Sequence, residues 1–209
     1  MKTFDIITEA DARTLEIGAT ISLKPGGHVT PLAADTIKER RITVLSGVAE
    51  ASLDGLAPVA DIKSIAIGSD HSGVALKATL RDHLRRRGLS VLDVGTDGTD
   101  PVDYPDIAAQ VARLVARQEV DAAIVIDGAG LGSAIAANKI AGARAAMCTD
   151  QTLARYSREH NGANVLALGA TLISVDAAKA IVDTWVGTPM REARYIRRLA
   201  KIRALEKLQ

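Results

Sequence analysis

One stretch indicates how the central part of the chain folds: Val125-Ile126-Asp127-Gly128-Ala129-Gly130-Leu131-Gly132-Ser133-Ala134-Ile135-Ala136-Ala137-Asn138-Lys139. An apolar run breaks into a loop with glycine at every second position and then resumes as a helical pattern. Glycines let the backbone approach a ligand closely, and the first N–H groups of the following helix point to the same place. With Asp127 at the start of the loop, the stretch predicts a site for a small anion. The alternative is a tight strand-to-helix turn that uses glycine for geometry alone.

Outward from this loop, strand-like and helix-like patterns alternate from Ser64 onward. This alternation predicts an α/β fold, a Rossmann-like three-layer αβα sandwich with a five-stranded parallel sheet. Ligands of such sheets bind at the carboxyl ends of the strands, where the strand order reverses. The expected strands are 65–68, 90–94, 122–126, 143–147 and 165–168, and the expected helices are 73–87, 107–117, one after 132, 152–159 and 177–185.

Residues 1–60 differ in kind and predict a small N-terminal α+β appendage with its linker, followed by a main domain over 61–209. The linker is expected over 47–61, where Gly55 and Pro58 lie. The other expected features are a capping box at Thr8, a turn at Pro25-Gly26-Gly27, an N-cap at Thr30 before Pro31, and a short strand over 42–45.

Composition narrows the function classes. The chain has 209 residues, 26 basic and 25 acidic side chains, and 2% aromatic residues, which argues against binding to nucleic acid. No apolar run is long enough to cross a membrane and no signal pattern opens the chain, so we expect a cytoplasmic protein. The single cysteine, Cys148, excludes an internal disulfide and a cysteine-based zinc site, and we expect it to be structural.

Five motifs stand out along the chain: Gly68-Ser69-Asp70-His71-Ser72-Gly73, Asp103-Tyr104-Pro105-Asp106, the glycine loop with Ala136-Ala137-Asn138-Lys139, Arg158-Glu159-His160-Asn161-Gly162-Ala163-Asn164-Val165-Leu166, and the basic cluster from Arg194 to Arg198. Taken in order, they resemble the type B ribose-5-phosphate isomerases and the related subunits of galactose-6-phosphate isomerase. The resemblance covers Ile65 to about Ile202. It implies an aldose–ketose isomerase of phosphorylated sugars that needs no metal or other cofactor, works through a cis-enediolate, and forms a homodimer with active sites built from both subunits.

Such a reaction needs a base at the carbon acid, donors for the enediolate oxygen, an acid that opens the ring, and cations for the phosphate. We expect Asp127 to be the base. The resemblance implies that His160 opens the ring and that Asp70 and Asn161 are the partners of the ring hydroxyl and the anion site. The resemblance also implies that Arg194 and Arg198, at i and i+4, grip the phosphate. The backbone N–H groups of Gly128, Gly130 and Gly132 can supply the anion hole for the enediolate oxygen. The full set expected to bind substrate is His71, Tyr104, Gly128, Gly130, Gly132, Ser133, Asn161, Arg194 and Arg198.

Each of these residues also has a plain structural interpretation. Asp70 is suited to cap a helix, His160 to end one, and the arginines to form a solvated face. Tyr104 lines the sugar pocket or anchors a loop.

The chain departs from the family pattern at several of these positions. The family commonly has cysteine as the base at the position of Asp127 and threonine at that of Ala129, and some members have a glutamate base at that of Ser133. A carboxylate is already ionised at neutral pH, so Asp127 can replace the thiol. Thr171 stands where many members have a phosphate-binding arginine, and Tyr195 where the family has a histidine.

Two other functions remain open from the sequence. Asp70, His71, Asp127 and His160 could gather a divalent metal for a metal-dependent isomerase or hydrolase. Alternatively, the domain is a non-catalytic module that binds a sugar phosphate. Substrate size also stays open, with a pentose or tetrose phosphate favoured.

The appendage resembles N-terminal segments of ethanolamine-utilisation enzymes of bacterial microcompartments, on Ile7-Thr8-Glu9-Ala10-Asp11, Val29-Thr30-Pro31-Leu32-Ala33-Ala34 and Glu39-Arg40-Arg41-Ile42-Thr43-Val44. This resemblance implies a segment that docks on a microcompartment shell or cargo protein. The alternative is an extension that stabilises its own domain.

Overall fold

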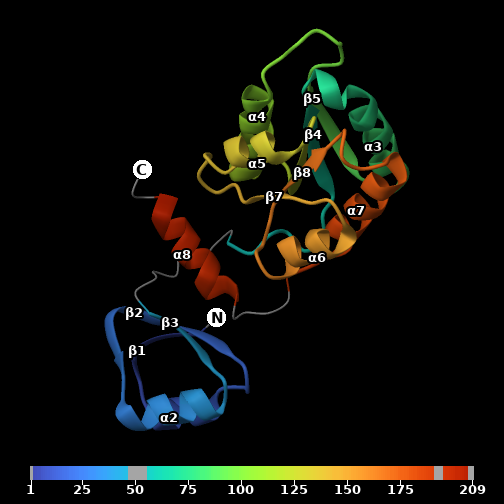
Figure 1. Cartoon of the computed structure of the whole chain (residues 1–209). Coiled ribbons are helices and arrows are strands. Elements are labelled where there is room, and N and C mark those ends of the chain that lie inside the picture. Colours follow the sequence, from blue (N-terminus) through green and yellow to red (C-terminus); the bar gives the residue numbers. More distant parts are fainter. Residues whose placement is uncertain (1, 47–55, 191–194, 207–209) are drawn as a thin grey trace. The chain divides into compact units, whose positions relative to one another are not determined.

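A computed structural model describes residues 2–46, 56–190 and 195–206 (Figure 1). The chain forms two compact units, one of Met1–Ala57 with Arg191–Gln209 and one of Pro58–Met190. The expected domain of 61–209 therefore differs from the second unit at its end, because helix α8 (Ile196–Glu206) groups with the N-terminal residues. Adjacency in sequence does not reveal which unit a terminal helix joins.

The second unit contains the predicted five-stranded parallel sheet, in the order β5-β4-β6-β8-β7. All five expected strands are present, each within two residues of its expected ends. The strands are β4 (Ser64–Ser69), β5 (Ser90–Gly95), β6 (Ala122–Asp127), β7 (Ala145–Met147) and β8 (Val165–Gly169).

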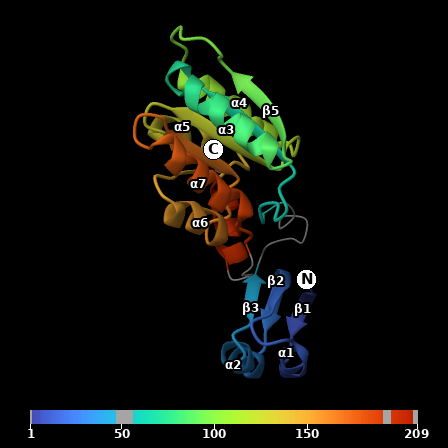
Figure 2. The same cartoon turned by 90° about the vertical axis from the view of Figure 1, so that its right-hand side faces the viewer.

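Helices cover both faces of this sheet, which confirms the three-layer sandwich. Helices α3, α6 and α7 pack on one face, and α4 and α5 on the other (Figures 1 and 2). The helices are α3 (Val74–Arg86), α4 (Tyr104–Ala116), α5 (Leu131–Ala137), α6 (Gln151–Glu159) and α7 (Val175–Gly187), and a short 3-10 helix, η2 (His71–Gly73), precedes α3.

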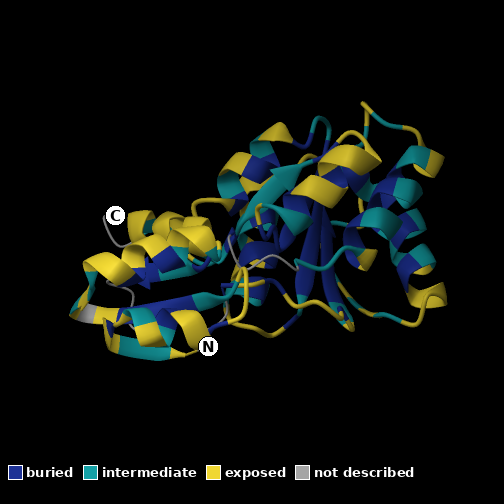
Figure 3. Ribbon diagram, turned by 90° about the horizontal axis from the view of Figure 1, so that it is seen from below, coloured by how far each residue is buried: buried dark blue, intermediate teal, exposed yellow. Residues whose placement is uncertain are grey.

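Burial on both faces explains why the strands were readable from the sequence. Side chains of β6 alternate between the two cores, with Ile124 and Ile126 packed toward α3 and α7 and Val125 toward α4. Every residue of β6 and β8 is buried, as the dark strands of Figure 3 show. A strand with no solvent-facing side reads as a continuous apolar run.

The strand order reverses between β4 and β6. The chain leaves β4 for β5 on one side and then crosses back to β6 on the other. In open α/β sheets a ligand crevice forms at this switch point, outside the carboxyl ends of the two strands. Asp70 follows β4 and Asp127 ends β6, so both predicted carboxylates lie at the switch point.

The N-terminal unit holds a parallel sheet in the order β1-β2-β3, with two intervening helices. The predicted capping box at Thr8 and the N-cap at Thr30 with its proline are confirmed, as is the strand near 42–45. Two strands of this sheet were not predicted. The elements are β1 (Thr3–Ile7), α1 (Glu9–Thr14), β2 (Thr20–Val29), α2 (Pro31–Glu39) and β3 (Thr43–Ser46).

The turn predicted at Pro25-Gly26-Gly27 is wrong, because β2 continues through it. The partners of β1 and β2 step from Phe4 with Leu23 to Ile6 with His28, so extra residues of β2 bulge out between them. Gly26 takes a positive φ of 82°, which suits glycine and permits the bulge.

Two further predictions concern the linker after this unit and the absence of a membrane-spanning segment. Most of the predicted linker, residues 47–55, lies outside the described residues. Within the described ranges, no helix is both long and apolar enough to cross a membrane.

Candidate active site

The carboxyl edge of the sheet brings Asp70 and Asp127 to neighbouring strand ends. The backbone N–H of Asp70 donates to the carbonyl oxygen of Ile126 at 3.1 Å, so the two loops leave the sheet side by side. Both side chains are nearly buried, at 6% and 5% exposure. Two carboxylates at a switch point are a plausible centre for proton transfer.

The carboxylate of Asp127 is held by the backbone of its own glycine loop. Its Oδ1 accepts hydrogen bonds from the N–H groups of Ala129, at 2.8 Å, and Gly130, and its Oδ2 accepts one from the N–H of Ser133 at 2.9 Å. Gly130 adopts a positive φ of 76°, which the loop needs in order to turn its N–H inward. The loop is therefore a cradle of N–H groups that holds the side-chain carboxylate of Asp127. Binding of a small anion from outside the chain stays a prediction.

This arrangement refines the expected anion hole. We expected the N–H groups of Gly128, Gly130 and Gly132 to face a substrate oxygen, but that of Gly130 faces Asp127. The N–H groups of Ala129 and Ser133 complete the cradle instead. Sequence reasoning missed this because it depends on the rotamer of Asp127.

The strand end of β8 holds the glycine loop from its other side. The carbonyl oxygen of Gly128 accepts hydrogen bonds from the N–H of Thr171, at 3.0 Å, and from its hydroxyl, at 2.7 Å. The N–H of Ala170 donates to the carbonyl oxygen of Asp127 at 2.8 Å. Thr171, at the position of a family arginine, thus stabilises the loop.

Asp70 caps the 3-10 helix η2, which agrees with its plain structural interpretation as a helix cap. Its Oδ1 accepts from the N–H of Ser72 at 2.9 Å, from the Ser72 hydroxyl at 2.6 Å, and from the N–H of Gly73 at 3.2 Å. A Cβ added to Gly128 would lie 3.6 Å from the Ser72 hydroxyl, so this cap borders the glycine loop. The cap fixes Asp70 beside Asp127, and its role toward a ring hydroxyl stays a prediction.

His71 and Tyr104 reach the same edge from two other segments. The Nδ1 of His71 accepts a hydrogen bond from the N–H of Val102 at 3.3 Å, so its Nε2 carries the proton when the ring is neutral. The ring of Tyr104 lies so close to Gly132 that a Cβ there would approach it to 2.5 Å. Tyr104 is 40% exposed, and its ring borders the glycine loop where the sugar pocket was predicted.

Ser133 is fully buried, and its hydroxyl has no hydrogen-bond partner among the described residues. Its backbone N–H serves the Asp127 carboxylate. A contact of Ser133 with substrate stays a prediction.

His160 and Asn161 lie at the opposite edge of the sheet. His160 ends helix α6, its N–H donates to the carbonyl oxygen of Tyr156 at 2.9 Å, and its ring stacks on the Tyr156 ring at 4.7 Å. The chain then enters β8 at Val165, and the other end of β8, at Gly169, pairs with Asp127. A five-residue strand spans about 15 Å, so these residues cannot meet Asp127 within one chain. The roles of His160 and Asn161 therefore stay predictions, and they depend on the site built from two subunits that the resemblance implies.

Arg158 holds the segment that carries His160, and sequence reasoning gave it no role. Its guanidinium is buried and donates to three carbonyl oxygens, those of Thr188 at 3.3 Å, Ala163 at 2.8 Å and Val59 at 2.6 Å. It also lies 4.9 Å from the centre of the Trp185 ring. Burial, and after it the charge of Arg144, lowers the pKa of Arg158 to about 10. Its place next to His160 in the family motif was the only signal.

Of the two arginines predicted to hold the phosphate, the structure describes one. Arg194 is outside the described residues, and Arg198 lies on α8 with its guanidinium 5.5 Å from the centre of the Tyr195 ring. Both stay predictions as phosphate ligands.

The metal site considered from the sequence is not formed within the chain. His160 is separated from Asp70, His71 and Asp127 by the length of β8. Across the described parts of the chain, no three His, Cys, Asp or Glu side chains are grouped so that they could hold a metal ion.

The chain is similar to known sugar phosphate isomerases in sequence and in structure. A family model described as Ribose/Galactose Isomerase matches residues 65–202. Ribose-5-phosphate isomerase B of Escherichia coli is 46% identical over 69% of this chain and 97% of its own length. D-erythrulose-4-phosphate isomerase of Pectobacterium atrosepticum is 41% identical over 59% of this chain and 82% of its own. A solved structure of ribose-5-phosphate isomerase B from Clostridium thermocellum superposes with a TM-score of 0.68 at 50% identity, covering 69% of this chain and 98% of that one.

Proposed function

Because the chain belongs to the ribose/galactose isomerase family and is an aldose–ketose isomerase of sugar phosphates, we propose that Asp127 is the base of its reaction. In this proposal the enzyme uses no metal ion. Asp127 removes a proton from the carbon next to the carbonyl, and a cis-enediolate forms. The hydroxyl proton passes to the former carbonyl oxygen, and Asp127 returns its proton to the neighbouring carbon.

The observation that carries the proposal is the Asp127 carboxylate in the glycine-loop cradle. It lies at the switch point, where ligands of this fold bind. Cradle N–H groups are also the donors that an enediolate oxygen needs. We infer that the substrate oxygen takes over part of this set when it binds, which leaves the carboxylate with fewer donors as it accepts the proton.

We propose that a second copy of the chain supplies His160 and Asn161. Support comes from their place at the opposite sheet edge and from exposed apolar side chains near Asp127. Leu131 and Ile135, one turn apart on α5, are 58% and 64% exposed, and Leu172 after β8 is 55% exposed. Exposed apolar residues grouped in this way are typical of an interface, here of a homodimer.

The substrate we propose is a pentose or tetrose phosphate, after the relatives named for ribose 5-phosphate and D-erythrulose 4-phosphate. Arg194 and Arg198 would hold the phosphate. Because Thr171 and Tyr195 replace two family residues that bear on phosphate binding, a turnover screen over tetrose, pentose and hexose phosphates is needed to find the substrate.

Replacing Asp127 by Asn tests the proposal. The amide keeps the shape and one acceptor oxygen, so the protein should fold and bind sugar phosphate. Turnover, and exchange of deuterium from solvent into the sugar, should fall about a hundredfold or more. Asp106→Asn, at an exposed site on α4, is the matched control.

Near-normal turnover in Asp127→Asn would refute the role of Asp127. Loss of wild-type activity on chelation, with recovery on adding a divalent metal, would refute metal independence. Binding of sugar phosphate without any deuterium exchange by the wild type would favour a non-catalytic module.

We propose that the N-terminal unit is a docking segment for a microcompartment shell or cargo protein. It has its own apolar core, which includes Ile7, Ile21, Leu23 and Ile42, and so can fold without help from the five-stranded sheet. Deleting residues 1–57 should leave a dimer that turns over sugar phosphate and no longer co-purifies with shell proteins. Loss of turnover without unfolding of the main domain would refute this assignment.

A further inference from the structure

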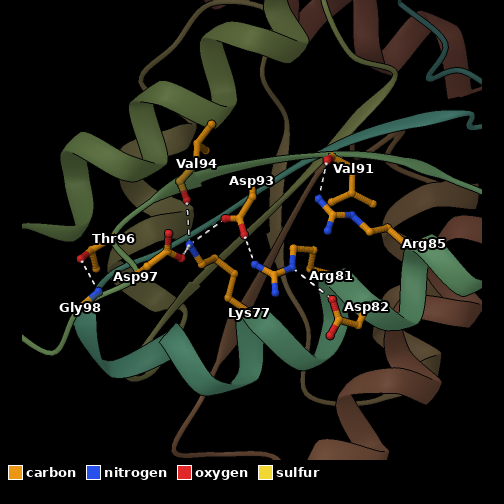
Figure 4. A network of polar contacts seen from close by, with 10 residues as sticks. All are labelled: Lys77, Arg81, Asp82, Arg85, Val91, Asp93, Val94, Thr96, Asp97 and Gly98. Atoms are coloured by element: carbon orange, nitrogen blue, oxygen red, sulfur yellow. Dashed lines mark hydrogen bonds and ion pairs between the residues drawn. The ribbon is translucent and has the colours of Figure 1, made fainter.

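A buried ion-pair network lies beside the candidate site and has no role in the mechanism above. Lys77 on α3 is fully buried, and its ammonium contacts Asp93 Oδ1 at 2.7 Å and Asp97 Oδ1 at 2.9 Å and donates to the Val94 carbonyl oxygen at 3.3 Å (Figure 4). The ammonium donates hydrogen bonds to Val94 and Asp97 and forms an ion pair with Asp93. Lys77 is therefore fixed in place by its contacts.

Asp93 links this lysine to a second cation. Its other oxygen accepts from Arg81 at 2.8 Å, and Arg81 also contacts Asp82 at 3.2 Å. Asp93 and Lys77 thus form the inner pair, with Arg81 and Asp82 on the α3 side and Asp97 on the loop side (Figure 4). Removing an outer carboxylate leaves the buried Lys77–Asp93 pair intact.

Asp97 is the point at which the network leaves the protein interior. Its side chain is 80% exposed, yet it binds an ammonium that is 1% exposed. The hydrogen bond from Lys77 lowers the pKa of Asp97, so this carboxylate stays ionised at neutral pH. An exposed loop is in this way tied to a rigid buried group.

The segment that starts here, residues 96–103, connects β5 to α4 and will be called the β5–α4 loop. It is largely exposed, and segments with few buried contacts open at low free-energy cost. Its far end carries the Val102 N–H, which binds His71 Nδ1, and leads into Tyr104 against Gly132. The loop therefore sets the tautomer of His71 and the position of Tyr104.

We propose that Asp97, held by the buried Lys77, is a positioning residue that fixes the β5–α4 loop and through it His71 and Tyr104. The inference rests on the proposed function, because it assumes that His71 and Tyr104 bind the sugar phosphate. Asp97 has no contact with the reacting atoms. Its effect is on substrate binding through the loop.

The test compares two equivalent substitutions in one network, Asp97→Asn and Asp82→Asn. Both remove an exposed carboxylate from a cation of the network, but only Asp97 lies on the loop. Asp97→Asn should raise KM about tenfold with kcat within about twofold, and Asp82→Asn should leave both within about twofold. Asp97→Glu, which restores the charge, should recover most of the wild-type KM.

Two measurements read the loop directly and do not need turnover. Amide hydrogen exchange at Val102 should be faster in Asp97→Asn than in wild type and unchanged in Asp82→Asn. Nitrogen chemical shifts of the His71 ring should report the Nε2–H tautomer in wild type and a mixture of tautomers in Asp97→Asn.

These outcomes separate the two proposals. If the wild type turns over no sugar phosphate, the proposed function fails, and the loop measurements still decide the role of Asp97. Unchanged Val102 exchange and His71 tautomer in Asp97→Asn would overturn the positioning role, as would equal effects of Asp97→Asn and Asp82→Asn on KM.

Discussion

At both edges of the five-stranded sheet charged side chains bind backbone groups, but the charges at the two edges are opposite. At the carboxyl edge, unpaired N–H groups converge, and the carboxylates of Asp70 and Asp127 bind them. At the amino edge carbonyl oxygens converge, and the guanidinium of Arg158 binds three of them. Helix starts favour negative groups and helix ends favour positive ones, which accounts for this division.

The comparison also explains why one chain does not complete the site. Asp70, His71, Tyr104 and Asp127 belong to the carboxyl edge, whereas His160 and Asn161 follow α6 to the amino edge. Under the proposed function, the catalytic set forms where the carboxyl edge of one copy meets the amino edge of another.

The largest effect is expected at the amino edge, from Arg158→Ala. This change leaves the carbonyl oxygens of Val59, Ala163 and Thr188 without their donor and removes a buried guanidinium, and it should lower the free energy of unfolding by about 3–5 kcal/mol. Urea denaturation measures the loss. Arg155→Ala, an exposed position on the same helix, is the control and should stay within about 0.5 kcal/mol. Equal stabilities of the two variants would show that the amino edge does not depend on Arg158.

A smaller effect is expected from Arg198→Ala. The carboxylates of the carboxyl edge repel a phosphate, so cations from elsewhere must hold it. Truncation of Arg198 should reduce kcat/KM by the equivalent of about 1.5–3 kcal/mol, the range for a hydrogen bond to a charged group. Arg197→Ala, the exposed neighbour on α8, should have little effect. If unphosphorylated sugars react as well as phosphorylated ones, the phosphate clamp is refuted.

The smallest effect is expected at Cys148, which follows β7 at the carboxyl edge and is the chain's single cysteine. Burial raises the pKa of its thiol to about 11, from an ordinary value of 9.0, so it stays protonated near neutral pH. Cys148→Ser should keep turnover within about twofold, and the native thiol should resist alkylation at pH 8. Rapid alkylation, or loss of turnover, would move the base from Asp127 to Cys148.

The same shift fixes the direction of a pH effect. The folded protein keeps the Cys148 proton to a higher pH than the unfolded chain does. The stability contributed by this group is therefore complete below about pH 9 and is lost as the pH rises through about 11. Cys148→Ser should flatten that part of the stability curve, as measured by urea denaturation across this range.

The sequence predicted the second unit better than the first, and burial explains the difference. Strands such as β6 are buried on both sides and read as apolar runs. Strand β1 has Asp5 and Ile6 exposed, and β2 contains Pro25-Gly26-Gly27, a pattern that normally ends a strand. Strands of this kind show little hydrophobic pattern in the sequence, so the three-stranded sheet was hard to predict.

Within the site, strand ends were predictable and side-chain partners were not. The place of Asp127 followed from the glycine loop, but its three N–H donors depend on a rotamer. The position of His160 at the amino edge of the sheet could have been predicted, because His160 precedes the strand that starts at Val165. Lys77 shares the buried face of α3 with Leu80 and Leu84, at helical spacing, which was a usable sign of a buried charge.

The most direct test of the divided site mixes two inactive variants, Asp127→Asn and His160→Ala. Alone, each should have about 1% of wild-type turnover or less. After subunits exchange at equal amounts, half of the dimers are mixed, and each mixed dimer has one site with both residues intact. The account predicts recovery to about a quarter of wild-type activity. Activity that stays at the sum of the two variants would show that Asp127 and His160 do not act across an interface, and would contradict the account.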